Sequence, residues 1–287
     1  MTGFETNAVH LPTTSTRGTQ DPTSKRWVKI AVSAAVAAFD RLPGRRPLAE
    51  RARGVILLYH DVPLSEQARF ARQLDQLLAA GTPVPCQELP GAPDGTWRIG
   101  VTFDDGLYSF ERVALPELRE RAIPSSMFVI SSLLREAELD TTPTHEGMPV
   151  LTKASVAELP LGGVEIGSHS EHHRRLSLID DCETSQELLN SRKQIEDLVG
   201  GPVRTLAFPY GDWSRRTVEL AVETGYETVY SVNPDLIGTR RADPVVRGRV
   251  VVAPTDWPVE TWLKLRGAYR WVAWWTRAKG VLRGNRP

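Results

Sequence analysis

The sequence predicts an α/β protein folded as a distorted (β/α) barrel with about seven parallel strands. Short apolar, β-prone runs alternate with amphipathic helical stretches from residue 54 onward, which favours a parallel sheet. These units follow one another without an internal repeat, which favours a closed or nearly closed barrel. Polar residues also gather directly behind the β-prone runs, where an α/β barrel carries its active site. A doubly wound open sheet is the alternative architecture.

The strand and helix patterns place the barrel within residues 54–260. The predicted strands are residues 54–59, 98–103, 125–130, 164–167, 203–208, 226–232 and 246–252. Apolar residues at helical spacing predict helices over residues 65–80, 109–122, 181–199 and 214–224. Residues 135–150 show neither pattern, so we expect an irregular loop there.

The composition is that of an ordinary globular protein, with 41% hydrophobic and 24% charged residues. The formal net charge is zero, so no overall field attracts nucleic acid and no nucleic-acid partner is expected. Cys86 and Cys182 show no metal-binding or redox spacing. They are interpreted as two free thiols, which suits a reducing compartment, with a disulfide between them as the alternative.

The N-terminal region divides into a polar tail and an apolar helix. Residues 1–26 are rich in Thr, Ser and Pro, which predicts a disordered tail. Residues 27–53 begin with an Ala-rich helix that is too short to cross a bilayer, which takes about 20 apolar residues. This helix either packs on the barrel or lies on a membrane surface. There is no convincing signal peptide, so we expect a cytoplasmic protein or one peripheral to the inner membrane.

The C-terminal region, residues 261–287, is predicted to be a basic, tryptophan-rich helix. From Trp262 to the last residue it holds many Lys and Arg residues and no acid. Aromatic and cationic side chains together suit a membrane interface or an anionic, lipid-linked substrate. A solvated helix that closes the barrel is the alternative.

Four separate segments place reactive or site-shaping residues directly behind predicted strands. Asp104 and Asp105 follow residues 98–103, and His169 follows the strand that begins at residue 164. Tyr210 follows residues 203–208, and His60 follows residues 54–59. Because parallel strands end at the same rim of a barrel, we expect these residues to meet there.

His169 and His173 are spaced as metal ligands. On a helical turn, a separation of four residues puts both imidazoles on one face. Two histidines and one carboxylate make three protein ligands and leave a position for water, which is the pattern of catalytic zinc. Of two adjacent acids, one can bind the metal while the other takes a proton from the activated water. Asp-Gly is also a turn signal, and the two histidines could be solvated loop residues.

These residues resemble a known family. Thr102-Phe103-Asp104-Asp105-Gly106, His169-Ser170-x-x-His173 and Phe208-Pro209-Tyr210-Gly211 are similar to the successive motifs of the polysaccharide deacetylases, the NodB-homology group (carbohydrate esterase family 4). The segment Leu58-Tyr59-His60-Asp61-Val62 resembles the tyrosine–histidine opening of one branch of that family. The likeness runs from about residue 54 to 253, which is most of the chain.

The resemblance implies a divalent metal, usually zinc, and removal of acetyl groups from a sugar polymer. By its motifs, Asp105, His169 and His173 would hold the metal and Asp104 would be the base. The backbone N–H of Tyr210 would help to hold the oxyanion. The implied partner is an acetylated glycan of the cell envelope, free or lipid-linked.

The sequence departs from the family pattern at two places. Ala207 stands where the third motif often carries an arginine, and Arg249 follows the pattern of the tyrosine–histidine branch that could orient Asp104 instead. The late histidine that protonates the leaving amine has no counterpart, because no histidine follows His173. His60, a water or Asp256 could take that role.

Two rival functions use the same residues. An Fe(II) oxygenase binds its metal through two histidines and a carboxylate, for which Glu171 has the right spacing from His169. The missing late histidine also suggests a weak or inactive protein that keeps its metal and binds glycans.

Overall fold

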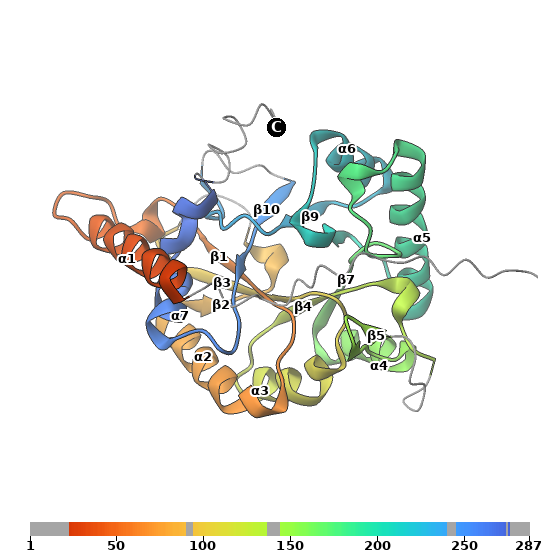
Figure 1. Cartoon of the computed structure of the whole chain (residues 1–287), viewed down its shortest axis with the longest axis horizontal. Helices are drawn as coiled ribbons and strands as arrows, with labels where there is room; N and C mark the ends of the chain where they lie inside the picture. Colours follow the sequence, from red (N-terminus) through yellow and green to blue (C-terminus); the bar gives the residue numbers. More distant parts are fainter. Residues whose placement is uncertain (1–22, 90–93, 137–143, 240–244, 274, 276–287) are drawn as a thin grey trace, which may run out of the picture.

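A computed structural model describes residues 23–89, 94–136, 144–239, 245–273 and 275. The chain folds into a parallel, nearly closed barrel with helices around it (Figure 1), which confirms the predicted architecture. Neighbouring strands follow the order β10-β9-β8-β7-β4-β3-β1-β11, and each pairing along this path is parallel. The barrel strands are β1 (Gly54–Tyr59), β3 (Arg98–Phe103), β4 (Ser125–Val129), β7 (Val164–Ser168), β8 (Thr205–Ala207), β9 (Thr228–Ser231), β10 (Val246–Gly248) and β11 (Val250–Val251). The short β2 (Thr82–Pro83) pairs with the start of β3.

The two ends of the sheet, β10 and β11, are halves of one extended segment. Val246–Gly248 pairs with β9, whereas Val250–Val251 pairs with β1 on the other side of the barrel. Arg249 lies between the halves, and its backbone N–H donates to the carbonyl of Ser231 (3.1 Å). The segment therefore bridges the first and last barrel strands, which makes about seven strands once its halves are joined.

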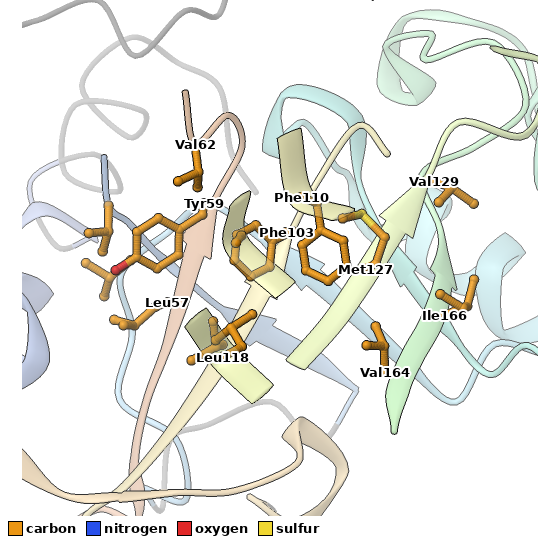
Figure 2. Packing of buried hydrophobic residues seen from close by; sticks show 14 of the residues in the cluster. Leu57, Tyr59, Val62, Phe103, Phe110, Leu118, Met127, Val129, Val164 and Ile166 are labelled. Atoms are coloured by element: carbon orange, nitrogen blue, oxygen red, sulfur yellow. The ribbon is translucent and has the colours of Figure 1, made fainter. Parts of the chain in front are cut away.

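Most of the hydrophobic core lies between the strands and the helices outside them. Phe103, Phe110 and Met127 are fully buried there, and Figure 2 shows them side by side. A smaller buried cluster, which includes Phe128 and Tyr230, fills the barrel interior. Gly167 lies in this interior, where an added Cβ would come within 2.4 Å of the Phe128 ring. The interior therefore has no room for a larger side chain at that position.

The helices surround the sheet, and four of them lie over the segments for which the sequence predicted helices. They are α1 (Thr23–Asp40), α2 (Gln67–Ala80), α3 (Leu115–Glu120), α4 (Lys153–Glu158), α5 (Asp181–Val199), α6 (Arg215–Thr224) and α7 (Pro258–Leu265). A π-helical turn, Phe110–Ala114, precedes α3. Local chemistry sets several ends: the Asp180 carboxylate caps α5, and Ser214 with Thr217 forms a capping box on α6.

The segment expected to be irregular, residues 135–150, contains a β-hairpin. Its strands β5 (Thr144–His145) and β6 (Met148–Pro149) pair antiparallel through Glu146 and Gly147, which both have positive φ. A two-residue turn of that kind matches strand twist. The strands are too short to show an alternating pattern, so the expectation of a wholly irregular loop was wrong.

The terminal regions are described in part. The helix α1 begins at Thr23, four residues before the expected start, and ends at Asp40, so it is shorter than the 27–53 segment. No helix among the described residues is long and apolar enough to cross a membrane. The C-terminal segment is not one continuous helix from residue 261, because α7 ends at Leu265 and Gly267 has a φ of 66°. The predictions for residues 1–22 and 276–287 lie outside the described residues. Cys86 and Cys182 are both free, as the spacing predicted.

Candidate metal centre

Asp104 and Asp105 lie at the carboxyl end of β3, where the chain leaves the barrel. Asp104 is two residues beyond Thr102, so both side chains point to the barrel interior. Asp105 would point outward in a continued strand, but its φ of 71° and the φ of 66° at Gly106 turn the backbone. The turn expected at Gly106 therefore starts at Asp105 itself, and both carboxyls are buried at the rim.

Arg249 holds Asp104 by two short hydrogen bonds. Its Nη1 donates to Oδ1 (2.6 Å) and its Nη2 to Oδ2 (2.7 Å). The guanidinium is fully buried, with its carbon 5.3 Å from the centre of the Phe128 ring and 5.6 Å from that of Tyr230. Such a bidentate pair fixes both the position and the rotation of the carboxylate.

His169 and His173 approach the Asp105 carboxylate from the end of β7. The segment is not a helical turn, which corrects the sequence-based reason for their convergence: Ser170 and His173 have φ of 63° and 57°. Ser168 and Ser170 stabilise this tight loop, because their hydroxyls accept from the N–H groups of Ser170 (3.1 Å) and His173 (3.0 Å).

Asp105, His169 and His173 present one ligand atom each, all within 4.8 Å of one another. Asp105 Oδ1 lies 3.4 Å from His169 Nε2 and 3.6 Å from His173 Nε2. Ligands of a tetrahedral ion at 2.0–2.1 Å are separated by about 3.3 Å, so these distances fit a zinc-like site. The Nδ1 of His169 is 2.7 Å from the Ala207 carbonyl. Donation there leaves the Nε2 lone pair for a metal, as in many metal-binding histidines.

The protonation states of the two aspartates and of His173 also suit a cation. Burial would raise the pKa of the Asp105 carboxyl, but the imidazoles of His169 and His60 outweigh it and hold the pKa far below its usual range. Burial alone would raise the pKa of the Asp104 carboxyl, but the Arg249 guanidinium outweighs this effect, so the pKa is lowered. Burial, with the neighbouring His169, lowers the pKa of His173 to about 3. The centre therefore offers ionised carboxylates and a neutral imidazole near neutral pH.

The other sequence-predicted residues lie at the same rim. The 3₁₀ turn Pro209–Gly211 places the Tyr210 ring 4.5 Å from the ring of His173, and Tyr210 has a φ of 60°. His60 follows β1 and is close enough for its charge to lower the pKa of both Asp104 and Asp105. Asp256 instead lies in an ion-pair network with Lys264 (2.6 Å).

Two neighbours in the histidine motif point elsewhere. The Glu171 carboxylate accepts from Asn190 and Gln194 of α5, both at 2.9 Å. His172 pairs with Glu187, also on α5, at 2.9 Å. Glu171 is therefore occupied outside the centre, which removes the observation that favoured an Fe(II) oxygenase.

The family model for polysaccharide deacetylases matches residues 92–229, which include Asp104, Asp105, His169, His173 and Tyr210. The segment of residues 92–229 belongs to the polysaccharide deacetylase family. A putative polysaccharide deacetylase of Bacillus subtilis, YxkH, is 23% identical over 134 residues, which are 47% of this chain and 44% of the relative. A peptidoglycan-N-acetylglucosamine deacetylase of Listeria monocytogenes, PgdA, is 27% identical over 217 residues, 75% of this chain and 40% of the relative. The chain thus spans less than half the length of these relatives.

Solved structures of deacetylases share the barrel. IcaB from Ammonifex degensii superposes with a TM-score of 0.63 at 25% identity, covering 76% of this chain and 97% of that one. PplD from Streptococcus pyogenes, in complex with acetate, gives a TM-score of 0.61 at 19% identity, covering 74% and 97%. The second likeness concerns the fold alone.

His145 is a residue at the candidate metal centre that sequence reasoning missed. The β5–β6 hairpin carries it to 3.7 Å (Nε2) from Asp105 Oδ1, and its ring centre lies 4.8 Å from that of His173. Within the described residues its buried Nε2 has no hydrogen-bond partner. The hairpin is attached to the aspartate motif, because Leu151 N–H donates to the Gly106 carbonyl (2.7 Å). The signal available in the sequence was that His145 directly precedes the Glu-Gly pair of a two-residue turn.

Backbone in the left-handed region is concentrated around the candidate metal centre. Among the described residues six non-glycine positions have positive φ: Asp105, Ala122, Glu146, Ser170, His173 and Tyr210. Ala122 lies after α3, whereas the other five belong to the centre or to the hairpin that carries His145. Strain of this kind persists where the surrounding structure fixes it, and it is typical of functional sites.

Proposed function

We propose that this chain is a metal-dependent hydrolase that removes acetyl groups, chiefly N-acetyl groups, from a cell-envelope polysaccharide or a lipid-linked glycan. One observation carries the proposal: a buried Asp–His–His cluster lies beside a second carboxylate that an arginine holds in place. Membership of the deacetylase family and the acetylated sugars named for its relatives support the same reaction class.

The proposed metal is Zn²⁺, held by Asp105, His169 and His173. One carboxylate and two imidazoles are donors that zinc binds with an open coordination position. When bound, the metal would supply Lewis-acid chemistry at the acetyl carbonyl. The hydrogen bond between His169 and Ala207 would keep the first imidazole oriented, and the Ser170 hydroxyl holds the loop that presents the second.

Asp104 is proposed as the base. Arg249 keeps its carboxylate ionised, and Oδ2 lies 3.8 Å from His169 Nε2, beside the ligand cluster but outside it. A carboxylate in this place can take the proton from the attacking water.

Two further roles complete the proposal. The backbone N–H of Tyr210 would donate to the oxyanion, because the left-handed turn sets this peptide at the rim beside His173. His60 would act on the leaving-group side, since it approaches both carboxylates from the neighbouring strand β1. The partner is an acetylated glycan, and a lipid anchor on that glycan would bring it to a membrane surface.

The decisive experiment compares two buried aspartates. Asp104→Asn is expected to lower the rate of acetate release from N-acetylated oligosaccharides by about 10²–10⁴-fold while zinc still binds, because only the proton acceptor is lost. Asp256→Asn makes the same change in the network around Lys264 and should leave the rate nearly unchanged. Acetate release and zinc titration are measured on both variants.

The same experiment tests the alternative function. A glycan-binding protein that keeps its metal but does no chemistry is suggested by the absence of any histidine after His173. If wild type releases no acetate across a panel of acetylated glycans but binds one of them, that alternative replaces the hydrolase.

A further inference from the structure

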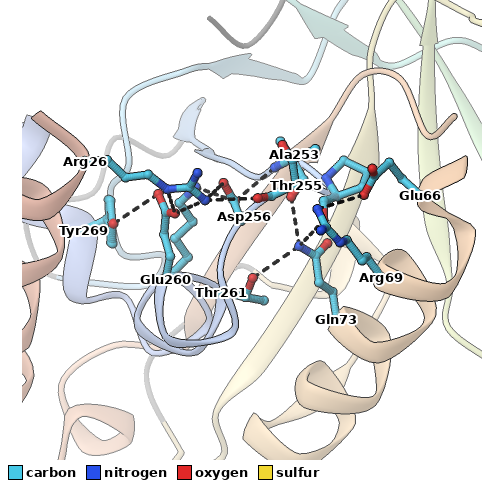
Figure 3. A network of polar contacts seen from close by, with 12 residues as sticks. Arg26, Glu66, Arg69, Gln73, Ala253, Thr255, Asp256, Glu260, Thr261 and Tyr269 are labelled. Carbon is cyan, nitrogen blue, oxygen red and sulfur yellow. Dashed lines mark hydrogen bonds and ion pairs between the residues drawn. The ribbon is translucent and has the colours of Figure 1, made fainter. Parts of the chain in front are cut away.

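The helix α1 is fixed to the barrel by a polar anchor at its start. Arg26 donates from Nε to Glu260 of α7 (2.8 Å) and from Nη2 to the Thr255 carbonyl (3.0 Å), and Figure 3 shows it between these groups. The guanidinium also lies 4.5 Å above the Trp257 ring. Because Thr255 follows β11, α1 begins at the same rim of the barrel as the metal centre.

Two more anchors fix the rest of the helix. In the middle, the Trp271 indole donates to the Ser33 hydroxyl (2.9 Å). At the end, Asp40 accepts two hydrogen bonds from Arg270 (2.7 and 2.8 Å) and one from Arg51 (2.9 Å). These anchors at its start, middle and end fix the orientation of α1 about its own axis, so one defined face points away from the barrel.

That outward face is apolar. Among the described residues, Val28, Val32, Phe39 and Leu42 are 60%, 37%, 50% and 50% exposed. With the exposed Ala35, Val28, Val32 and Phe39 are spaced by four, three and four residues, so these four form one stripe along α1, and Leu42 follows in the turn after Asp40. We call these five residues the α1 stripe. Contiguous exposed apolar side chains of this kind are typical of an interaction site.

The surroundings of the α1 stripe are cationic. Exposed Lys25 lies near its start, and exposed Arg45 and Arg46 lie beyond its end. The Arg45 guanidinium rests 3.6 Å from the centre of the Phe39 ring, so charge and apolar surface adjoin. Asp40 is the single acid between residues 23 and 46, and it is already bound to Arg270.

We propose that the α1 stripe docks on the surface of a lipid bilayer that carries anionic phospholipid. The apolar side chains would enter the interface, and Lys25, Arg45 and Arg46 would meet the lipid phosphates. A protein partner with an apolar groove would not need cations at both ends of the stripe, whereas an anionic bilayer matches both features. Docking would set the rim of the barrel, and with it the metal centre, at a fixed orientation to the membrane.

The test measures co-sedimentation of the full chain with vesicles of phosphatidylcholine, with and without phosphatidylglycerol. Wild type should bind the anionic vesicles in preference to the neutral ones. Val32→Glu/Phe39→Glu should weaken that binding by about tenfold or more, because two interfacial side chains become charged. Changing Lys25, Arg45 and Arg46 to Gln should weaken it by about fivefold per charge.

The matched control places the same charges on exposed leucines outside α1. Leu161→Glu/Leu178→Glu alters side chains that are 90% and 75% exposed and should leave vesicle binding unchanged. Equal binding of wild type to both vesicle types would overturn the proposal, as would unchanged binding of Val32→Glu/Phe39→Glu. A shift of that variant from dimer to monomer without loss of vesicle binding would assign the stripe to a second copy of the chain.

Vesicle binding does not depend on the deacetylase proposal. Val32→Glu/Phe39→Glu should release acetate from a soluble oligosaccharide at the wild-type rate, while Asp104→Asn should bind vesicles like wild type. Each proposal can therefore fail without the other.

Discussion

The described residues include a buried cluster of charge inside the barrel and another between α1, α2 and α7, and the two differ in charge balance. In the outer cluster, Arg26 and Lys264 face Asp256 and Glu260, so two cations meet two carboxylates. In the inner cluster one cation, Arg249, meets Asp104, and the neighbouring Asp105 faces imidazoles. Both clusters bury ion pairs, so burial alone does not distinguish them. The inner cluster differs because, within the described residues, Asp105 has no arginine or lysine to match its charge, as expected of a centre that binds a metal.

The largest expected effect is on the free energy of unfolding, and it differs between the two arginines. Arg249→Leu should lower the free energy of unfolding by about 3–5 kcal/mol, because it leaves the Asp104 carboxylate buried without a partner. Arg26→Leu should cost about 1–2 kcal/mol, since Glu260 keeps Lys264 (3.5 Å) nearby. Urea unfolding of both variants gives the two values. Equal losses would remove the distinction between the clusters, and Arg249→Leu/Asp104→Leu should recover much of the loss.

A smaller effect is expected from the histidine that the hairpin adds to the inner cluster. His145→Ala should lower kcat/KM by about five- to tenfold, because its Nε2 is positioned to hydrogen-bond a substrate bound beside Asp105. His172→Ala is the matched control, because that imidazole pairs with Glu187 outside the centre. Steady-state kinetics with zinc titration distinguish a contact to substrate, which leaves zinc affinity unchanged, from a contribution to metal binding.

The smallest effect concerns the strained backbone. Ala122→Gly should raise the free energy of unfolding by about 1 kcal/mol without changing activity, because a left-handed alanine after α3 has no functional neighbour. Tyr210→Gly relieves the same strain but removes the ring against His173, so activity should fall. Thermal unfolding and acetate release are measured together. If Ala122→Gly also lost activity, the functional importance of left-handed backbone would not be limited to the metal centre.

The sequence predicted the barrel and the ligand cluster because both follow from local patterns. Alternating strands and helices specify parallel pairing, and parallel strands bring Asp105 and His169 to one rim. The spacing of His169 and His173 suggested convergence for a reason that was wrong, since a left-handed loop rather than a helical turn joins them. The resemblance of the motifs therefore predicted which residues lie together, but not the backbone conformation that brings them together.

Two features needed three-dimensional information. His145 lies on strands of two residues, which carry no period, and it reaches Asp105 through pairing of Leu151 with Gly106. The closure of the barrel at Arg249 depends on a segment that pairs with β9 at one half and with β1 at the other. Long-range pairing of this kind leaves no mark in a local pattern.

The position of Arg249 makes the centre dependent on closure of the barrel. All three proposed ligands and Asp104 precede residue 174, but the guanidinium that orients Asp104 arrives with the segment that joins β9 to β1. During synthesis the chain could present its ligand set long before its base is held in place. Competence for hydrolysis would then report that the barrel has closed, so that an incomplete or locally opened molecule could bind metal but not act on an acetyl group.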